Sequence, residues 1–131
     1  MATEPGYGQF PLRTFLGMEL DDVGDGRARA RVHISNAHLN PNGFVHGAVV
    51  FALVDTGMGK ATMSVLPDGQ RCASVEVHLR FIRPVSAGDL SAEACVVKRG
   101  RSLVHLEARV HDGDERLVAT ATGTFTVIDA S

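Results

Sequence analysis

Only one stretch of the sequence, residues 47–66, is long and continuous enough to predict a substantial helix. Its apolar residues fall on nearly every side of the helix rather than along one stripe: Val49, Val50, Phe51, Leu53, Val54, Met58, Met63, Val65 and Leu66. A helix without a polar face has to be covered by other parts of the protein. The turn-forming run Pro67, Asp68 and Gly69 is expected to end it. The remaining chain is therefore constrained to fold around this helix.

Most of that remaining chain alternates apolar and polar residues, which is typical of strands with one buried face. The pattern predicts six strands, at residues 15–22, 27–35, 74–81, 90–97, 103–110 and 117–127. The first two are joined at Gly24, Asp25 and Gly26, where Asp-Gly is a strong hairpin signal. Short connections favour antiparallel neighbours. The sequence predicts an α+β protein in which a curved antiparallel sheet of about six strands wraps around one long central helix.

Length and composition bound the class of protein. A chain of 131 residues with 44% hydrophobic content predicts a single domain over residues 1–131, with a loose Gly- and Pro-containing segment at residues 1–9. A net charge of −2, with 5% aromatic residues and no Trp, argues against nucleic-acid binding. Cys72 and Cys95 lie in strand-like runs and are interpreted as small buried hydrophobes. Without a signal-like N-terminus or a membrane-length apolar run, a soluble cytoplasmic protein is expected.

Asp55 is the residue that fits the predicted helix least well. Its short carboxylate is flanked by Phe51, Val54 and Met58, and burying an unpaired carboxylate is costly. Desolvation would raise the pKa of Asp55, and carboxylates with raised pKa values gather at functional sites. The competing interpretation is that Asp55 lies on a solvent-exposed stripe of the helix near Thr56. Composition alone leaves both interpretations open.

His46 and Gly47 lie where the preceding loop becomes the helix. The first amides of a helix have no partner within it and carry the positive end of its dipole, and glycine lets a ligand approach the backbone. Such a helix start can bind negative charge that develops on a carbonyl oxygen. Close packing of Gly47 on the sheet and a hydrogen-bonded loop histidine are the structural alternatives. Neither residue alone decides between them.

Other catalytic motifs do not hold. The run from Gly57 to Lys60 resembles part of a phosphate-binding loop, but the earlier glycine is missing and Ala61 replaces the Ser or Thr. No Gly-x-Ser-x-Gly elbow is present. The six histidines show no metal-ligand spacing, so no metal site is predicted.

The stretch from Asn40 to Asp55 resembles the PaaI-type group of hotdog-fold thioesterases. In that family an Asn lies six residues before a His-Gly pair that opens the helix, and an acidic residue follows the His by nine, as here. The strand motifs at 74–84 and 119–125 are similar as well, so the resemblance extends over residues 12–128. It implies a hotdog fold and an acyl-CoA thioesterase, in which the CoA thioester is the substrate and no cofactor is needed.

The resemblance also implies a role for each matching residue. Asp55 would be the nucleophile or general base, and the Gly47 amide would polarise the thioester carbonyl. Asn40 would help hold the carbonyl or the water, while His46 would support the loop and contact the thioester. Ser74 matches a position that orients water near the acid in some relatives.

Two positions depart from the pattern. Ala48 stands where the family often has a second Gly, which narrows the room beside the oxyanion amide. In another hotdog group a Thr lies one turn after the acid, and here that position is Gly59, which favours Ser74 as the hydroxyl.

Gly47 and Asp55 are eight residues apart, or about 12 Å along a helix. They cannot both reach one carbonyl carbon. The shared dimer sites of the family solve this with antiparallel helices, so a homodimer or a dimer of dimers is expected. Arg83, Arg99 and Arg101 could bind the CoA phosphates, or could be solvated strand ends and turns.

A non-catalytic acyl-CoA-binding or sensing protein on the same fold is the alternative function, and a hotdog dehydratase is a weaker one. Asp55 discriminates between an enzyme and a binder, since a pure binder needs no buried carboxylate facing the thioester.

Overall fold

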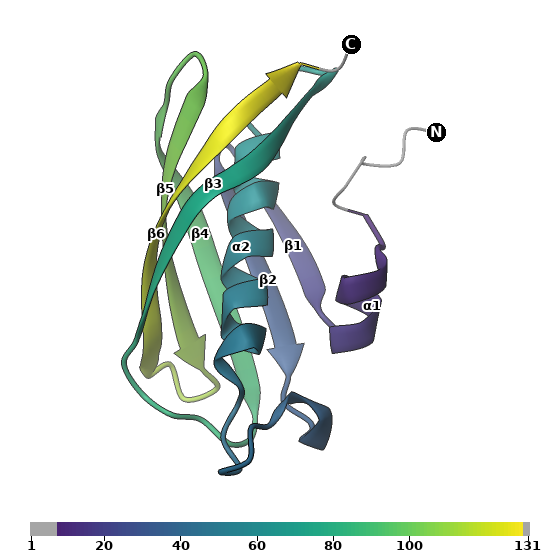
Figure 1. The fold of residues 1–131 in the computed structure, drawn as a ribbon, viewed down its shortest axis with the longest axis vertical. Coiled ribbons are helices and arrows are strands. Elements are labelled where there is room, and N and C mark those ends of the chain that lie inside the picture. Colours follow the sequence, from purple (N-terminus) through teal and green to yellow (C-terminus); the bar gives the residue numbers. More distant parts are fainter. Residues whose placement is uncertain (1–7, 130–131) are drawn as a thin grey trace.

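The computed structural model describes residues 8–129, which form one six-stranded antiparallel sheet with a long helix lying across it (Figure 1). The elements are α1 (Pro11–Leu16), β1 (Glu19–Gly24), β2 (Arg27–His33), the 3₁₀ turn η1 (Asn36–His38), α2 (Gly47–Met63), β3 (Gln70–Phe81), β4 (Asp89–Arg99), β5 (Leu103–Asp112) and β6 (Leu117–Asp129). The strand order across the sheet is β1-β2-β4-β5-β6-β3. The predicted curved sheet around a single long helix is confirmed.

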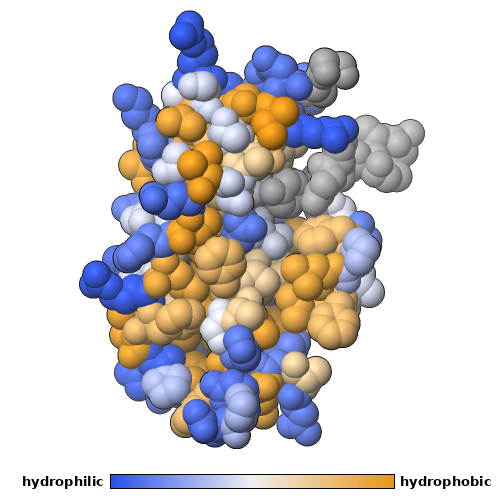
Figure 2. Space-filling view, viewed as in Figure 1, coloured by the Kyte–Doolittle hydropathy of each residue, from blue (hydrophilic) through white to orange (hydrophobic). Residues whose placement is uncertain are grey.

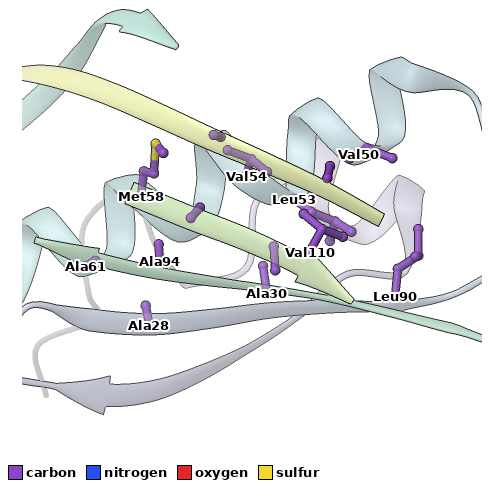
Figure 3. Packing of buried hydrophobic residues seen from close by; sticks show 14 of the residues in the cluster. Ala28, Ala30, Val50, Leu53, Val54, Met58, Ala61, Leu90, Ala94 and Val110 are labelled. Carbon is purple, nitrogen blue, oxygen red and sulfur yellow. The ribbon is translucent and has the colours of Figure 1, made fainter. Parts of the chain in front are cut away.

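The long helix α2 approaches the sheet closely because the residues beneath it are small. A Cβ atom added at Gly57 would lie 3.7 Å from the Cβ of Ala94 and 3.8 Å from that of Ala30. Figure 3 shows these alanines on the strands that α2 covers, in the same cluster as the larger helix side chains Leu53 and Met58. The sheet therefore fixes the position of α2, and with it every functional group that the helix carries.

Gly123 on β6 makes room for Met58, which is fully buried. A Cβ atom at Gly123 would lie 2.5 Å from the sulfur of Met58 and 3.5 Å from the carbonyl oxygen of Glu76. We expect Gly123→Ala to lower the free energy of unfolding by about 1–3 kcal/mol through overpacking. Urea unfolding measures this, with Gly113→Ala as the control, because a Cβ there meets only one backbone atom at 3.8 Å. Equal unfolding midpoints for the two variants would contradict the predicted overpacking.

The predicted strand at residues 15–22 is wrong at its start. Residues Pro11–Leu16 form the short helix α1, and β1 begins only at Glu19. Proline at the first turn suits a helix start, and Gly17 ends the helix in the left-handed conformation with φ of 71°. The long helix was also predicted three residues too far, since α2 ends at Met63.

The two cysteines are only half-buried, contrary to the prediction. The pairing of the strands places Cys95 opposite Arg27 and Glu107, which face solvent. Most of the segment predicted to be loose, residues 1–9, lies outside the described residues. Within residues 8–129, no helix is long and apolar enough to cross a membrane.

Candidate active site

At the N-terminus of α2, several of the first backbone amides have an acceptor within the described residues, and the amide of Gly47 has none there. The His46 amide donates to the His38 carbonyl (2.8 Å), the Ala48 amide to Nδ1 of His46 (2.9 Å), and the Val49 amide to the His46 carbonyl (2.9 Å). Gly47 lies between His46 and Ala48, and no acceptor for its amide is found within residues 8–129. The helix dipole adds positive potential at this point. The Gly47 amide can therefore donate to an oxygen that gains negative charge.

Asn40 shapes the loop that leads into the helix. Its side-chain oxygen Oδ1 accepts hydrogen bonds from the amides of Asn42 (2.9 Å) and Phe44 (3.1 Å). Its own amide donates to the Phe44 carbonyl, and Leu39 and Val45 pair in an isolated antiparallel bridge. The side-chain oxygen of Asn40 is thus used by the loop. Only its Nδ2 group is left to contact a ligand, since no partner for it lies within the described residues.

Asp55 lies about two turns further along α2 and is half-buried. Its Oδ1 atom is fully buried and has no hydrogen-bond partner in the described part of the chain. Burial raises the pKa of the Asp55 carboxyl above the ordinary value of 3.8, and the hydroxyl of Ser74 opposes this shift with a smaller effect. A desolvated carboxylate beside a hydroxyl has the chemistry of a general base or a nucleophile.

Ser74 reaches Asp55 at an irregularity in β3. Ser74 pairs with Phe125 and Glu76 with Thr124, so that Val75 is left without a partner on β6. Val75 was predicted on the buried face but is 59% exposed at this bulge. Bulges redirect the side chains around them and are frequent beside active sites. The bulge therefore explains why the hydroxyl of Ser74 lies beside Asp55.

Three phenylalanines stand partly exposed near the same end of the helix. Phe44 and Phe51 are each 41% exposed, and Phe81, predicted on the buried face, is 57% exposed. A Cβ at Gly47 would lie 2.9 Å from Cζ of Phe81, so this ring packs directly on the Gly47 backbone. Apolar surface is also gathered over this half of the molecule in Figure 2. Exposed apolar surface of this kind is typical of a binding face.

The structure does not bring the three predicted phosphate-binding arginines together. Arg83 follows β3 just beyond Phe81, and therefore lies at the Gly47 end of the helix. Arg99 donates to the carbonyl of Val65, beyond the other end of α2, and Arg101 lies in the adjoining turn. A helix of 17 residues spans about 26 Å. Within one chain, Arg83 is thus remote from Arg99 and Arg101.

The predicted catalytic residues form two groups in the same way. Asn40, His46 and Gly47 lie together at the start of α2, whereas Asp55 and Ser74 lie together along its length. One continuous helix carries both Gly47 and Asp55, and separates them by about 12 Å. A single chain therefore presents two half-sites.

Comparisons with known proteins identify the family to which this chain is similar. The family model of the thioesterase superfamily matches residues 42–119. SSO1253 of Saccharolobus solfataricus, provisionally named an esterase, is 30% identical over 121 residues, which cover 91% of this chain and 79% of that protein. BH2602 of Bacillus halodurans, solved with CoA, has 32% identity and a TM-score of 0.81, covering 89% of this chain and 75% of its own. PaaI of E. coli, from the phenylacetic acid degradation operon, shares the fold with a TM-score of 0.84 at 22% identity, covering 92% and 86%.

The curved sheet, the buried helix and the family match together define a hotdog-fold enzyme of the thioester hydrolase class. The chain belongs to the thioesterase superfamily.

Proposed function

We propose that the protein hydrolyses acyl-CoA thioesters, with the Asp55 carboxylate as the nucleophile or general base and the Gly47 amide as the oxyanion donor. The observation that carries this proposal is the buried carboxyl oxygen of Asp55, which has no partner among residues 8–129, on the same helix whose first amide has none there either. Leaving polar atoms unsatisfied costs stability, and active sites are where proteins accept that cost. The relative solved with CoA supports a CoA thioester as the substrate.

The chemistry needs two events at the thioester. The Gly47 amide donates to the carbonyl oxygen, which becomes negative as the carbonyl carbon is attacked. Acting as a general base, Asp55 takes a proton from water, the resulting hydroxide adds to the carbon, and the carbon–sulfur bond breaks as the proton passes from Asp55 to the leaving sulfur, giving the free acid and CoA. Acting as a nucleophile, Asp55 adds to the carbonyl carbon, the carbon–sulfur bond breaks and the CoA thiolate leaves and takes up a proton, and water then hydrolyses the mixed anhydride to release the acid. Both routes give the same products.

The proposal requires two chains, because one chain holds its amide and its acid about 12 Å apart. Strand β3 lies at one edge of the sheet, is 12 residues long and exposes Val75 and Phe81. A long edge strand with exposed apolar residues is suited to association with another chain. We propose a homodimer in which antiparallel α2 helices set Gly47 and Asn40 of one protomer beside Asp55 and Ser74 of its partner.

The same arrangement explains the separated arginines. Antiparallel helices bring the C-terminal end of one α2 toward the N-terminal end of the other, so Arg99 and Arg101 of one protomer approach Arg83 of its partner. Guanidinium groups suit phosphate oxygens. We propose that this composite group binds the nucleotide phosphates of CoA.

We expect a variant with Arg99→Ala and Arg101→Ala to raise KM for acyl-CoA by about tenfold or more, since one charge-assisted hydrogen bond alone contributes about 1.5 kcal/mol or more. For the same acyl group on N-acetylcysteamine, which has no phosphates, KM should not change. Arg27→Ala, on the solvent face of the sheet, is the matched control. An equal rise of KM for both thioesters would contradict phosphate binding by these residues.

The direct test of the proposed function is release of free CoA thiol from a panel of acyl-CoAs graded in chain length and aromaticity. Turnover of at least one acyl-CoA that disappears in Asp55→Ala is the expected result. Saturable binding of acyl-CoA without any turnover would instead favour a non-catalytic acyl-CoA-binding protein.

A further inference from the structure

We infer that His46 is a positioning residue, a neutral N-terminal cap of α2 that leaves the Gly47 amide as the backbone donor for the thioester oxygen. The inference rests on the proposed function and assigns His46 a part in it that differs from direct contact with the substrate.

The hydrogen bond at the helix start determines which nitrogen of the His46 ring carries the proton. Nδ1 accepts the amide proton of Ala48 at 2.9 Å, so Nδ1 carries no proton and the neutral ring has its proton on Nε2. Histidine is not among the residues usually found as helix caps, which are Ser, Thr, Asp and Asn. Here its ring takes the place of their side-chain oxygen.

The cap determines which amide a ligand meets. With the Ala48 amide held by the ring and the Val49 amide held by the His46 carbonyl, the Gly47 amide remains. The His46 amide is itself held by the His38 carbonyl, which anchors the capping residue to the loop. Without the ring, the Ala48 amide would become a second free donor and the first turn would be less well fixed.

The charge of the cap also matters. An aspartate cap would bind the same amide and would stabilise the helix dipole, so it is favourable for folding. It would also place a full negative charge one residue from the amide that has to stabilise a developing negative oxygen. A neutral imidazole caps the helix without that repulsion. Stability and catalysis therefore rank the possible caps in different orders.

Three variants separate these effects: His46→Ala, His46→Asn and His46→Asp. In His46→Ala, kcat should fall by about tenfold or more, a fraction of the 10²–10³ lost when an oxyanion donor is removed outright. In His46→Asn, which caps without charge, kcat should recover to within about threefold of wild type. In His46→Asp, the thermal midpoint should equal or exceed that of wild type while kcat stays about tenfold low.

The test consists of kcat, KM and the thermal midpoint for the wild type and the three variants, with the acyl-CoA that the wild type turns over fastest. A wild-type kcat in His46→Asp would mean that the cap is only structural, and would overturn the inference. A His46→Asn variant as slow as His46→Ala would overturn it too, because the ring would then do something other than capping. Wild-type protein without turnover of any acyl-CoA would instead refute the proposed function, and the positioning role with it.

Discussion

Asp55→Asn is expected to lose most turnover while the fold becomes more stable near neutral pH. The amide can neither take a proton from water nor attack the thioester, and general acid–base catalysis of this kind contributes about 10²–10⁴-fold. Asp55 is also half-buried, and one of its oxygens has no partner among the described residues, so its charge destabilises the folded state. Thiol release and urea unfolding measure the two effects on the same samples.

The pH dependence of this stability difference follows from the sign of the pKa shift. Burial raises the pKa of Asp55 in the folded protein above 3.8, so the folded state binds that proton more tightly than the unfolded chain does. The resulting contribution is complete below pH 3.8 and is lost as the pH rises through the higher folded pKa. Wild type should therefore lose stability relative to Asp55→Asn as the pH rises through this range. Asp68→Asn, at an exposed turn position, is the control. Parallel stability curves would contradict the raised pKa of Asp55, and retained turnover would contradict its catalytic role.

Mixed dimers are expected to recover activity that neither parent variant has. Asp55→Ala lacks the acid, and Gly47→Leu blocks the oxyanion amide, because even a Cβ there would lie 2.9 Å from the Phe81 ring. In a mixed dimer with shared sites, one site carries both lesions and the other carries neither. Activity per mixed dimer should return to about half that of wild type, since independent sites act additively.

Two different affinity tags allow the mixed dimers to be purified before the assay. Should Gly47→Leu fold poorly, Asn40→Asp replaces it, because the carboxylate can still accept the loop hydrogen bonds while the Nδ2 donor is lost. Purified mixed dimers that stay as inactive as both parents would mean that each site is built within one chain. The antiparallel arrangement of α2 would then be wrong.

The fold could be predicted where local pattern decides it. Alternating residues located the later strands, and the all-round apolar helix predicted its own covering by a sheet. The order of the strands could not be predicted, because the pairing of β3 with β6 joins residues far apart in the sequence. The helix α1 was missed because six residues are too few to show a helical period, although Pro11 and Gly17 mark its two ends.

The candidate site was harder to predict in its details. Asp55 could be found because a carboxylate interrupts an apolar run, and His46 and Gly47 because they open the helix. The bulge at Val75 could not be predicted, because the alternation of apolar and polar residues in the sequence continues unbroken through Ser74, Val75 and Glu76. The exposure of Phe81 was missed for a related reason, because alternation reports which face a side chain occupies and not whether that face is covered at the edge of the sheet.

The single helix that carries both Gly47 and Asp55 restricts how proteins of this kind can diverge. Inserting one residue between the two would turn the acid by about 100° around the helix axis, away from β3. Insertions and deletions are therefore excluded from this segment, whereas the exposed side chains of Phe44 and Phe81 can change without altering that spacing. Descendants of this chain can therefore alter the apolar surface beside the candidate site, with the spacing of Gly47 and Asp55 inherited unchanged.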